Sequence, residues 1–318
     1  MLMNVVWLLL GLGLLTFGGD SLVRGALALA KRWGVSPLLA GLVIVGFGTS
    51  APELVVSLQA ALGASPDIAL GNVIGSNIAN ILLILGICGL ILPLLAHPNA
   101  LKRDGLAMIG ATIFCLLLFR DGSLNRLDGI MFLVALAAYL IWSYRTERVD
   151  PGAADVALHQ AEADLVEKRP TSLWLSVALA VGGLALLIAG ARAFLTGAVG
   201  IGEALGIPET LIGLTLVAVG TSLPELAVSL IAVLRRQADV AVGNIVGSNI
   251  FNILGILGVS SLIQPLSLAG RLLAVDQWVM LAAALALVVF LLSGKRLNRI
   301  EAALLLTGYV TYVAFMAV

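Results

Sequence analysis

Long apolar stretches separated by short polar turns occur along the whole chain. A helix needs roughly 20 apolar residues to cross a bilayer core of about 30 Å, and by this measure the pattern predicts ten membrane spans. The predicted spans cover residues 4–30, 36–62, 68–94, 104–120, 125–144, 172–199, 207–233, 240–265, 273–293 and 298–317. The expected fold class is therefore all-α, a polytopic membrane protein with ten transmembrane helices.

One polar stretch interrupts this pattern and divides the spans into two groups of five. Residues 145–170 hold six acidic and four basic side chains, and the segment is too short for a folded domain. The predicted organisation is a first five-helix unit at 1–144, a polar linker at 145–171 and a second five-helix unit at 172–318.

Composition agrees with a membrane protein. Of the 318 residues, 60% are apolar and 11% are charged, whereas a soluble domain has about a quarter of its residues charged. This balance excludes a disulfide scaffold, a disordered chain, a nucleic-acid binder and an ordinary cytosolic enzyme. Cys88 and Cys115 lie in apolar runs and are predicted to be packing residues. His97 and His159 lie in predicted loops, and no span holds a Ser–His or Asp pair, so we do not expect an enzyme.

The placement of Lys and Arg predicts the orientation in the membrane. Thirteen of these residues fall in loops on one side of the predicted spans and three on the other. Cytoplasmic loops carry the excess of positive charge, so the richer side, which includes the linker at 145–171, is assigned to the cytoplasm. With ten spans, both termini then lie outside the cytoplasm.

An internal repeat relates the two groups of spans. GTSAPELVVSL at 48–58 aligns with GTSLPELAVSL at 220–230 with nine identities in eleven positions, and GNVIGSNIANILLILG at 71–86 aligns with GNIVGSNIFNILGILG at 243–258 with twelve in sixteen. Both pairs have an offset of 172 residues, which indicates one duplication. Because five is an odd number of spans, the second copy enters the membrane from the opposite side. Inverted repeats of this kind are typical of secondary transporters, whose binding site lies near the bilayer midplane between the copies.

Each repeat places one carboxylate in the middle of a predicted span, Glu53 in the first and Glu225 in the second. A charge at this depth costs several kcal/mol and by default marks a functional site. Neither motif contains Lys or Arg, so a cation from solution is the natural partner. The alternative is a protonated glutamate hydrogen-bonded between helices, which is harder to reconcile with two glutamates at matched positions.

A proline precedes each glutamate and predicts a broken helix. Pro52 and Pro224 lack the amide hydrogen that a helix interior needs, which frees carbonyls around Gly46–Thr49 and Ala218–Thr221. Irregular backbone at membrane depth is tolerated where it lines a cavity or meets a ligand. A simple kink is the alternative. The same segments add four candidate hydroxyl groups, those of Thr49, Ser50, Thr221 and Ser222.

The second motif of each repeat predicts a polar stripe on one helix face, because its residues recur at intervals of four. The stripe is Asn72, Ser76 and Asn80 in the first copy and Asn244, Ser248 and Asn252 in the second. Asn77 and Asn249 lie on an adjacent face, and packing between helices is at least as good an interpretation for them as cation binding. The roles of Asn72 and Asn244, nearer the span ends, stay open.

Together these residues form an all-oxygen donor set without His, Cys or Met. Such a set suits Ca²⁺, which takes six to eight oxygens in flexible geometry, or Na⁺, and disfavours Zn²⁺, Cu²⁺ and Ni²⁺. Mg²⁺ is less favoured because it keeps its waters and prefers rigid octahedral sites. Two negative charges match one Ca²⁺ or two Na⁺.

GTSAPE and GTSLPE, each followed by GNVIGSNIAN or GNIVGSNIFN, resemble the two alpha-repeats of the sodium/calcium exchanger family, of the prokaryotic type. The resemblance covers nearly the whole chain. It implies an Na⁺/Ca²⁺ antiporter in the inner membrane, with Ca²⁺ and Na⁺ as transported ions and no cofactor or obligatory protein partner. The ligands that it implies are Thr49, Ser50, Glu53, Ser76, Asn80, Thr221, Ser222, Glu225, Ser248 and Asn252, with backbone carbonyls near Gly46 and Ala218.

Two features depart from the wider family. Some members carry Asp at the position of Asn252, so the two-acid pocket here puts potassium co-transport in doubt. The linker at 145–171 is far too short for the regulatory calcium-binding domains of the animal exchangers.

Three other functions are compatible with parts of the pattern. A Ca²⁺/H⁺ antiporter would let protons compete for the two carboxylates, although proton-coupled relatives place their acids in a GNxxE context that is absent here. A cation channel would contain broken helices, but a two-glutamate site favours tight occupancy over flux. An intramembrane enzyme fits least. Asp20 and Arg192 occupy equivalent repeat positions, and an ion pair between them would link spans 1 and 6.

Overall fold

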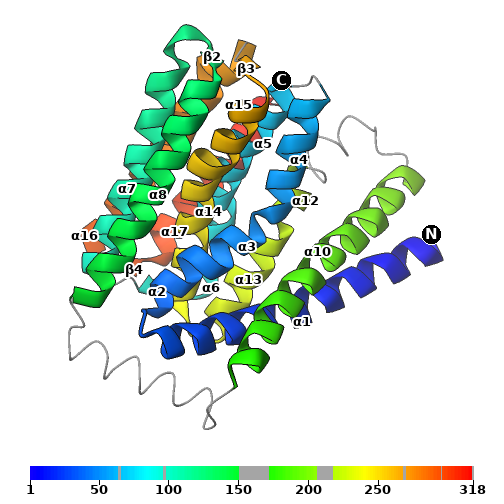
Figure 1. Cartoon of the computed structure of the whole chain (residues 1–318). Helices are drawn as coiled ribbons and strands as arrows, with labels where there is room; N and C mark the ends of the chain where they lie inside the picture. The colour runs from blue at the N-terminus through cyan, green and yellow to red at the C-terminus, as the bar shows by residue number, and fades with distance from the viewer. Residues whose placement is uncertain are drawn as a thin grey trace.

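The computed structural model describes residues 1–63, 66–95, 98–149, 172–205, 218–267, 270–294 and 296–316. Nearly all of them are helical (Figure 1). The helices of the first half are α1 (Leu2–Trp33), α2 (Pro37–Ala40), the π-helix η1 (Gly41–Gly46), α3 (Phe47–Thr49), α4 (Ala51–Leu62), α5 (Pro66–Ala79), the π-helix η2 (Asn80–Ile84), α6 (Leu85–Ile91), α7 (Pro98–Leu118), the 3-10 helix η3 (Phe119–Asp121) and α8 (Arg126–Val149).

The second half repeats this order. Its described helices are α10 (Leu173–Ala204), α12 (Ala218–Thr221), α13 (Leu223–Leu234), α14 (Ala238–Ile250), the π-helix η5 (Phe251–Ile256), α15 (Leu257–Ile263), the π-helix η6 (Leu272–Asp276), α16 (Gln277–Gly294) and α17 (Arg299–Met316). Four two-residue strands lie at the helix ends, β1 (Leu94–Leu95), β2 (Ser123–Leu124), β3 (Leu266–Ser267) and β4 (Arg296–Leu297).

The helices agree with the predicted spans. Within the described residues, seven helices are long and apolar enough to cross a membrane, and an eighth span results if Pro37–Thr49 and Ala51–Leu62, bent by 41°, are counted together. Helix α7 occupies the predicted span 104–120, and α13 occupies the end of span 207–233, whose first part lies outside the described residues. The all-α membrane fold is confirmed, and a count of ten spans is consistent with it.

The predicted linker can be compared only at its start. Helix α8 continues to Val149, beyond the predicted boundary at 144, and 150–171 lie outside the described residues. The division into two units at these boundaries therefore stays a prediction.

The two halves exchange equivalent contacts, as inverted repeats should. Strand β1 of the first half pairs with β4 of the second, and β2 of the first pairs with β3 of the second. The pairs Leu94–Leu297 and Leu124–Leu266 are therefore mutual counterparts in the two repeats. This reciprocity indicates a pseudo-two-fold relation between the halves.

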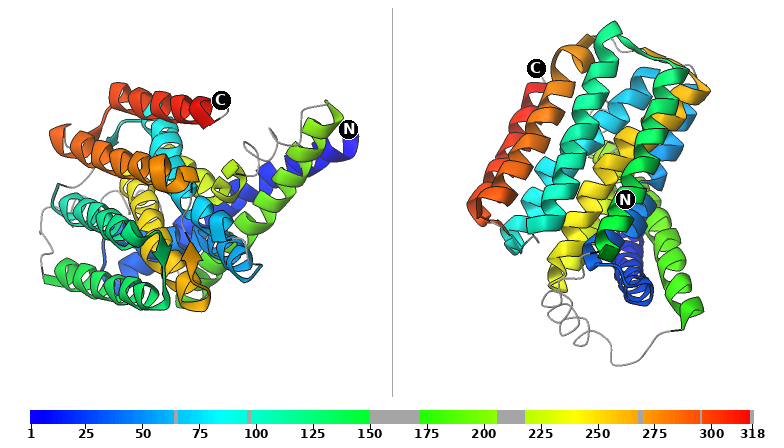
Figure 2. Two further views of the ribbon diagram at one scale, coloured as in Figure 1. Left: turned by 90° about the horizontal axis from the view of Figure 1, so that it is seen from above. Right: turned by 60° about the vertical axis from the view of Figure 1, so that its left-hand side comes forward.

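Helices α1 and α10 pack side by side and antiparallel, and they diverge from the rest of the bundle (Figure 1 and the left view of Figure 2). Glycines allow this contact. A Cβ on Gly18 would lie 2.8 Å from the Leu187 nitrogen, and a Cβ on Gly190 would lie 2.8 Å from the Leu15 nitrogen. The two contacts are again equivalent, since the partners are also 172 residues apart.

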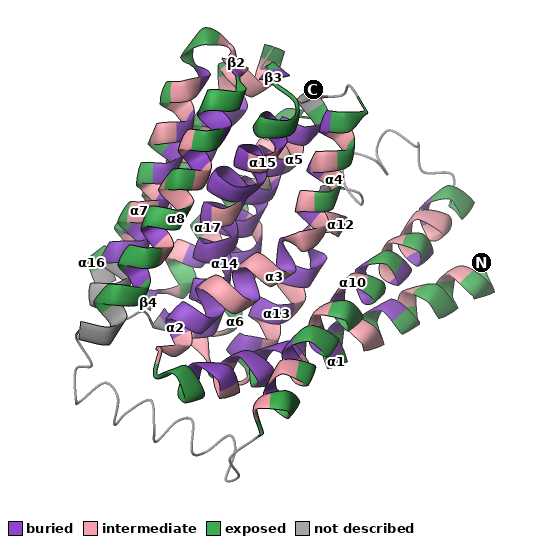
Figure 3. Cartoon of the chain, viewed as in Figure 1, coloured by how far each residue is buried: buried purple, intermediate pink, exposed green. Residues whose placement is uncertain are grey.

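The core lies along the third and eighth predicted spans. Residues buried inside the protein make up 94% of the apolar window in Ala238–Ile263 and 72% in Ile68–Ile91, but 22% in α1 and 28% in α10. Figure 3 shows the same contrast between the buried α14–α15 and the exposed faces of α1 and α10. Cys88 and Cys115 are fully buried free thiols, which confirms their prediction as packing residues.

Candidate cation-binding site

Each repeat breaks its helix directly before the glutamate. Ser50, with φ −80° and ψ 6°, separates α3 from α4, and Ser222, with φ −87° and ψ 9°, separates α12 from α13. Pro52 and Pro224 fall in the first turn of the new helix, where a missing N–H costs nothing. The predicted breaks are therefore present in both halves.

The breaks place Glu53 and Glu225 in the first turns of α4 and α13. The amide groups at a helix N-terminus favour a negative charge there. Both glutamates are completely buried, with 0% of their surface exposed. The protein thus holds two carboxylates in its interior, each at the positive end of a short helix.

Hydrogen bonds from two serines bring the carboxylates together across the repeats. The Ser50 hydroxyl donates to Glu225 Oε1 at 3.0 Å, and the Ser222 hydroxyl donates to Glu53 Oε1 at 3.4 Å. Each of these two serines therefore contacts the carboxylate of the other half. The site is shared between the repeats, as the inverted duplication predicts.

Several acceptor oxygens around this point have no hydrogen-bond partner. They come from both repeats and are Glu53 Oε2, Glu225 Oε2, Asn80 Oδ1, Asn252 Oδ1 and Thr221 Oγ1. Helix α4 packs against η5, which begins next to Asn252, and α13 packs against η2, which begins at Asn80. A buried oxygen without a partner is costly, so this set is suited to a ligand that accepts electron pairs from oxygen.

The Gly46 carbonyl lies at the end of η1 and is approached by α14. It accepts from the Ser248 hydroxyl at 3.0 Å and from the Thr49 hydroxyl at 3.3 Å. The Thr49 oxygen also lies 3.1 Å from Asn244 Oδ1. A Cβ on Gly46 would lie 2.9 Å from both the Asn244 carbonyl oxygen and the Ser248 nitrogen, so only glycine fits here.

The other predicted residues take equivalent places in the fold. Ser76 is 4% exposed on α5 and is the counterpart of Ser248. Ala218 is the first residue of α12, and the residues before it lie outside the described residues.

Asn72 and Asn244 hold the helices that carry the glutamates. Asn72 Nδ2 donates to the Ser57 hydroxyl at 2.9 Å and to the Glu53 carbonyl at 3.2 Å. Asn244 Nδ2 makes the equivalent bonds to Ser229 at 2.9 Å and to the Glu225 carbonyl at 3.3 Å. Sequence reasoning did not single out the two serines, although both lie inside the duplicated motif four residues after the glutamate.

All the donors of the candidate site are oxygen atoms, which suits a hard cation. Its donors are carboxylate, amide, hydroxyl and carbonyl oxygens, the ligands that Ca²⁺ takes in flexible geometry. Among the described residues, no group of three or more His, Cys, Asp or Glu side chains could hold a metal ion. The donor set therefore differs from a transition-metal site, which would use His or Cys.

Comparison with known proteins connects this arrangement to one family. The model of the family described as "Sodium/calcium exchanger protein" matches residues 3–145 and 175–318. This chain belongs to the sodium/calcium exchanger family. It is therefore a member of a family of cation transporters rather than of enzymes, and an integral membrane protein. The family model covers both repeats, as the resemblance of their sequence motifs predicted.

Relatives match most or nearly all of this chain. It is 41% identical to the "Putative antiporter CaxA" of Alkalimonas amylolytica and 34% identical to the "Sodium/calcium exchanger MaX1" of Methanosarcina acetivorans, each over 98% of both chains. It is 38% identical to the "Inner membrane protein YrbG" of Escherichia coli over 83% of this chain and 81% of that one. A solved structure of the sodium-calcium exchanger NCX_Mj superposes with a TM-score of 0.85 at 33% identity and 99% coverage of both chains.

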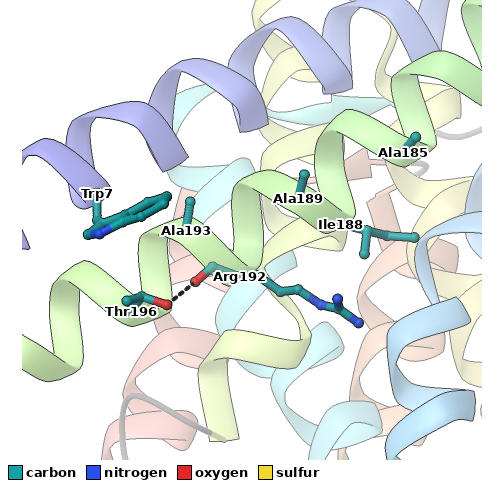
Figure 4. Close-up of a pocket in the computed structure, with 7 residues that line it drawn as sticks. All are labelled: Trp7, Ala185, Ile188, Ala189, Arg192, Ala193 and Thr196. Carbon is teal, nitrogen blue, oxygen red and sulfur yellow. Dashed lines mark hydrogen bonds between the residues drawn. The ribbon is translucent and has the colours of Figure 1, made fainter.

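A separate cavity lies against α10, away from the predicted ligands. It has a volume of about 610 Å³ and is lined by Trp7, Ala185, Ile188, Ala189, Arg192, Ala193 and Thr196 (Figure 4). None of the candidate ligands lines it, so this cavity is separate from the candidate cation site.

The pairing of Asp20 with Arg192, which the repeat left open, is not the one that the structure shows. Asp20 pairs with Arg24 at 2.9 Å within α1 and with Arg235 at the end of α13. Arg192 lies on α10 and lines the cavity described above.

Proposed function

We propose that this chain exchanges Na⁺ for Ca²⁺ across the membrane, by alternating access to the site between the two repeats. The observation that carries the proposal is the reciprocal bonding of Ser50 to Glu225 and of Ser222 to Glu53, which leaves one buried oxygen of each carboxylate without a partner. A cation is the partner that two such oxygens require.

In this proposal the two glutamates bind one Ca²⁺ through Glu53 Oε2 and Glu225 Oε2. The unpartnered amide oxygens of Asn80 and Asn252 and the Thr221 hydroxyl complete the donor set. Na⁺ ions compete for the same carboxylates. The neighbouring groups available to them are Thr49, Ser50, Ser76, Ser222, Ser248 and the carbonyls near Gly46 and Ala218.

Exchange follows from the charge of the site. When it is empty, two carboxylates lie in a buried, poorly hydrated place, and moving them through an occluded state costs several kcal/mol. One Ca²⁺ or two Na⁺ neutralise this charge. Transport of one ion is then coupled to return of the other, because the charged empty site does not cross.

Helices α1 and α10 are the elements suited to move. They pack mainly against each other, and only 22% of the apolar window of α1 and 28% of that of α10 is buried, while α5 and α14 form a buried core around the site. Sliding of the pair past the core would open the site first to one side and then to the other.

The counter-ion and the orientation are part of the proposal. Support for Na⁺ comes from the names of MaX1 and NCX_Mj, which describe those proteins as sodium/calcium exchangers. The excess of Lys and Arg on one side supports a cytoplasmic linker and outward termini. The name of the Escherichia coli relative supports an inner membrane.

Uptake of ⁴⁵Ca²⁺ into proteoliposomes tests this function. Vesicles that contain the full chain and internal Na⁺ should accumulate ⁴⁵Ca²⁺ when diluted into Na⁺-free medium, with the voltage fixed by an ionophore. Vesicles with an outward H⁺ or K⁺ gradient and no Na⁺ should accumulate little. Uptake driven by H⁺ alone would contradict Na⁺ coupling and favour the Ca²⁺/H⁺ antiporter, and single-channel currents would favour a channel.

The ion pair between Asp20 and Arg235 joins α1 of the first half to the end of α13 in the second half, and the equivalent positions on α10 and at the end of α4 lack it. The repeat counterparts of these residues are Arg192 and Gly63, which cannot form such a pair. The pair should therefore favour the arrangement in which the end of α13 contacts α1. An ion pair of this exposure contributes up to about 1 kcal/mol.

Replacing Arg235 by alanine should loosen this contact. A Cβ on Gly19 would lie 2.5 Å from Ile231 Cδ1, so Ile231 faces α1, and a cysteine placed there reports the separation. Maleimide labelling of Ile231→Cys should become up to about fivefold faster in the Arg235→Ala background. Arg24→Ala is the matched control, because Arg24 pairs with Asp20 on the same helix. If Arg24→Ala and Arg235→Ala accelerated the labelling equally, the Asp20–Arg235 ion pair would not be what holds α13 against α1.

A further inference from the structure

Asn77 and Asn249 bind each other's backbone across the pseudo-two-fold axis. Asn77 Nδ2 donates to the Asn249 carbonyl at 3.3 Å, and Asn249 Nδ2 donates to the Asn77 carbonyl at 3.4 Å. Both side chains are only 1% exposed, so water does not replace these bonds. Because a backbone carbonyl can only accept, each amide must turn its NH₂ group toward the other helix.

Two methionines take the second hydrogen of each amide. Asn77 Nδ2 lies 3.6 Å from Met280 Sδ, and Asn249 Nδ2 lies 3.8 Å from Met108 Sδ. A thioether sulfur accepts weakly and cannot donate, so it reinforces the same orientation. The Oδ1 atoms of both asparagines are thereby fixed on the opposite side of the amide.

Those Oδ1 atoms accept from the two asparagines of the cation site. Asn252 Nδ2 donates to Asn77 Oδ1 at 3.0 Å, and Asn80 Nδ2 donates to Asn249 Oδ1 at 3.1 Å. An amide that gives its NH₂ group to one neighbour directs its oxygen away from that neighbour. Asn80 Oδ1 and Asn252 Oδ1 are buried and have no protein partner.

The reverse orientation of either site amide is excluded by the same contacts. If Asn252 were turned over, its oxygen would face Asn77 Oδ1 and its NH₂ group would face the cation, and both contacts would repel. The Asn249 carbonyl thus fixes the orientation of the Asn77 amide, and Asn77 in turn fixes the orientation of Asn252. In the same way, the Asn77 carbonyl fixes the Asn249 amide, and Asn249 fixes the orientation of Asn80.

We propose that Asn77 and Asn249 are positioning residues, which orient the amide oxygens of Asn252 and Asn80 toward the transported cation. Each of them belongs to the repeat opposite to the ligand that it orients. The inference rests on the part of the proposed function that places Asn80 and Asn252 in the cation site, but not on exchange with Na⁺.

Calcium binding to the purified full chain tests this role, measured by titration calorimetry in detergent. Asn77→Leu keeps a similar side-chain volume and removes the amide that holds Asn252. We expect it to weaken Ca²⁺ binding about tenfold. Asn249→Leu should weaken binding by a similar factor, because its contacts are equivalent.

A carboxylate at the ligand position removes the need for orientation, because both of its oxygens can bind a cation. In the Asn252→Asp background, Asn77→Leu should therefore no longer weaken Ca²⁺ binding, while Asn249→Leu should still cost about tenfold. In the Asn80→Asp background the pattern should be reversed. A general packing defect would not depend on which ligand carries the carboxylate.

The proposal would be overturned if Asn77→Leu and Asn249→Leu lowered Ca²⁺ affinity equally in all backgrounds. It would also be overturned if one aspartate restored the affinity of both variants. If Asn77→Leu is not recovered as a folded protein, Asn77→Ser removes the same amide without adding an apolar group, and the same crossed pattern is required of it. Wild-type protein that binds Ca²⁺ but does not exchange it for Na⁺ would contradict the proposed function and leave this test intact.

Discussion

Replacing either Glu53 or Glu225 by glutamine is expected to abolish Na⁺-driven ⁴⁵Ca²⁺ uptake. Each substitution removes one of the two negative charges in the site and puts an NH₂ group among oxygens that have no other partner. Removing one partner of a buried charge pair costs about 3–5 kcal/mol, which corresponds to more than about a hundredfold in affinity. The two substitutions should have similar effects, because both glutamates are fully buried and each is bonded by the serine of the other repeat.

Glu203→Gln is the matched control for this prediction. Glu203 is exposed near the end of α10, so the same chemical change there should leave uptake at the wild-type level. The measurement is initial ⁴⁵Ca²⁺ uptake into vesicles with equal amounts of protein. Wild-type uptake by Glu53→Gln or Glu225→Gln would show that the carboxylates do not bind the transported ion.

The duplication in the sequence predicted which candidate residues take equivalent places in the fold, but not which of them contact each other. Matched motifs identified both glutamates and the breaks before them, because a proline and a carboxylate at membrane depth each have a physical cost that needs an explanation. The sequence did not show that Ser50 bonds Glu225 rather than Glu53, its neighbour three residues along the chain. That contact depends on how two helices 172 residues apart cross, which no local pattern specifies.

The asparagines show the same limit. Spacing placed Asn77 and Asn249 next to the polar stripe but left packing and cation binding open. Their structural contacts favour packing, since their amide hydrogens go to backbone carbonyls across the axis. The π-helical segments that begin at Asn80 and Phe251 were not predicted either. An extra residue in a helical turn leaves no clear signature in apolar periodicity, although such turns are frequent at functional sites.

Replacing Gly247 by alanine should disrupt the site without touching a ligand. Helix α14 crosses η1 so closely that a Cβ on Gly247 would overlap the Leu42 carbonyl oxygen and lie 2.7 Å from the Leu42 Cα. Backbone atoms cannot turn away as a side chain can, so the helices must separate, at a cost of about 1–3 kcal/mol or more. Because η1 ends at Gly46, whose carbonyl accepts from Ser248, the separation would also displace the first half of the site.

We expect Gly247→Ala to lower the apparent melting temperature of the purified protein by several degrees and to reduce ⁴⁵Ca²⁺ uptake at least about tenfold. Gly110→Ala on α7 is the control, since a Cβ there would meet nothing within 4 Å. Alanine is favoured over glycine inside a helix by about 0.5–1 kcal/mol, so the control should melt at the wild-type temperature or above it. If Gly247→Ala instead melts and transports like Gly110→Ala, then the contact of α14 with η1 does not hold the site in place. A normal melting temperature with lost uptake would show that the substitution displaces the site without lowering the stability of the protein.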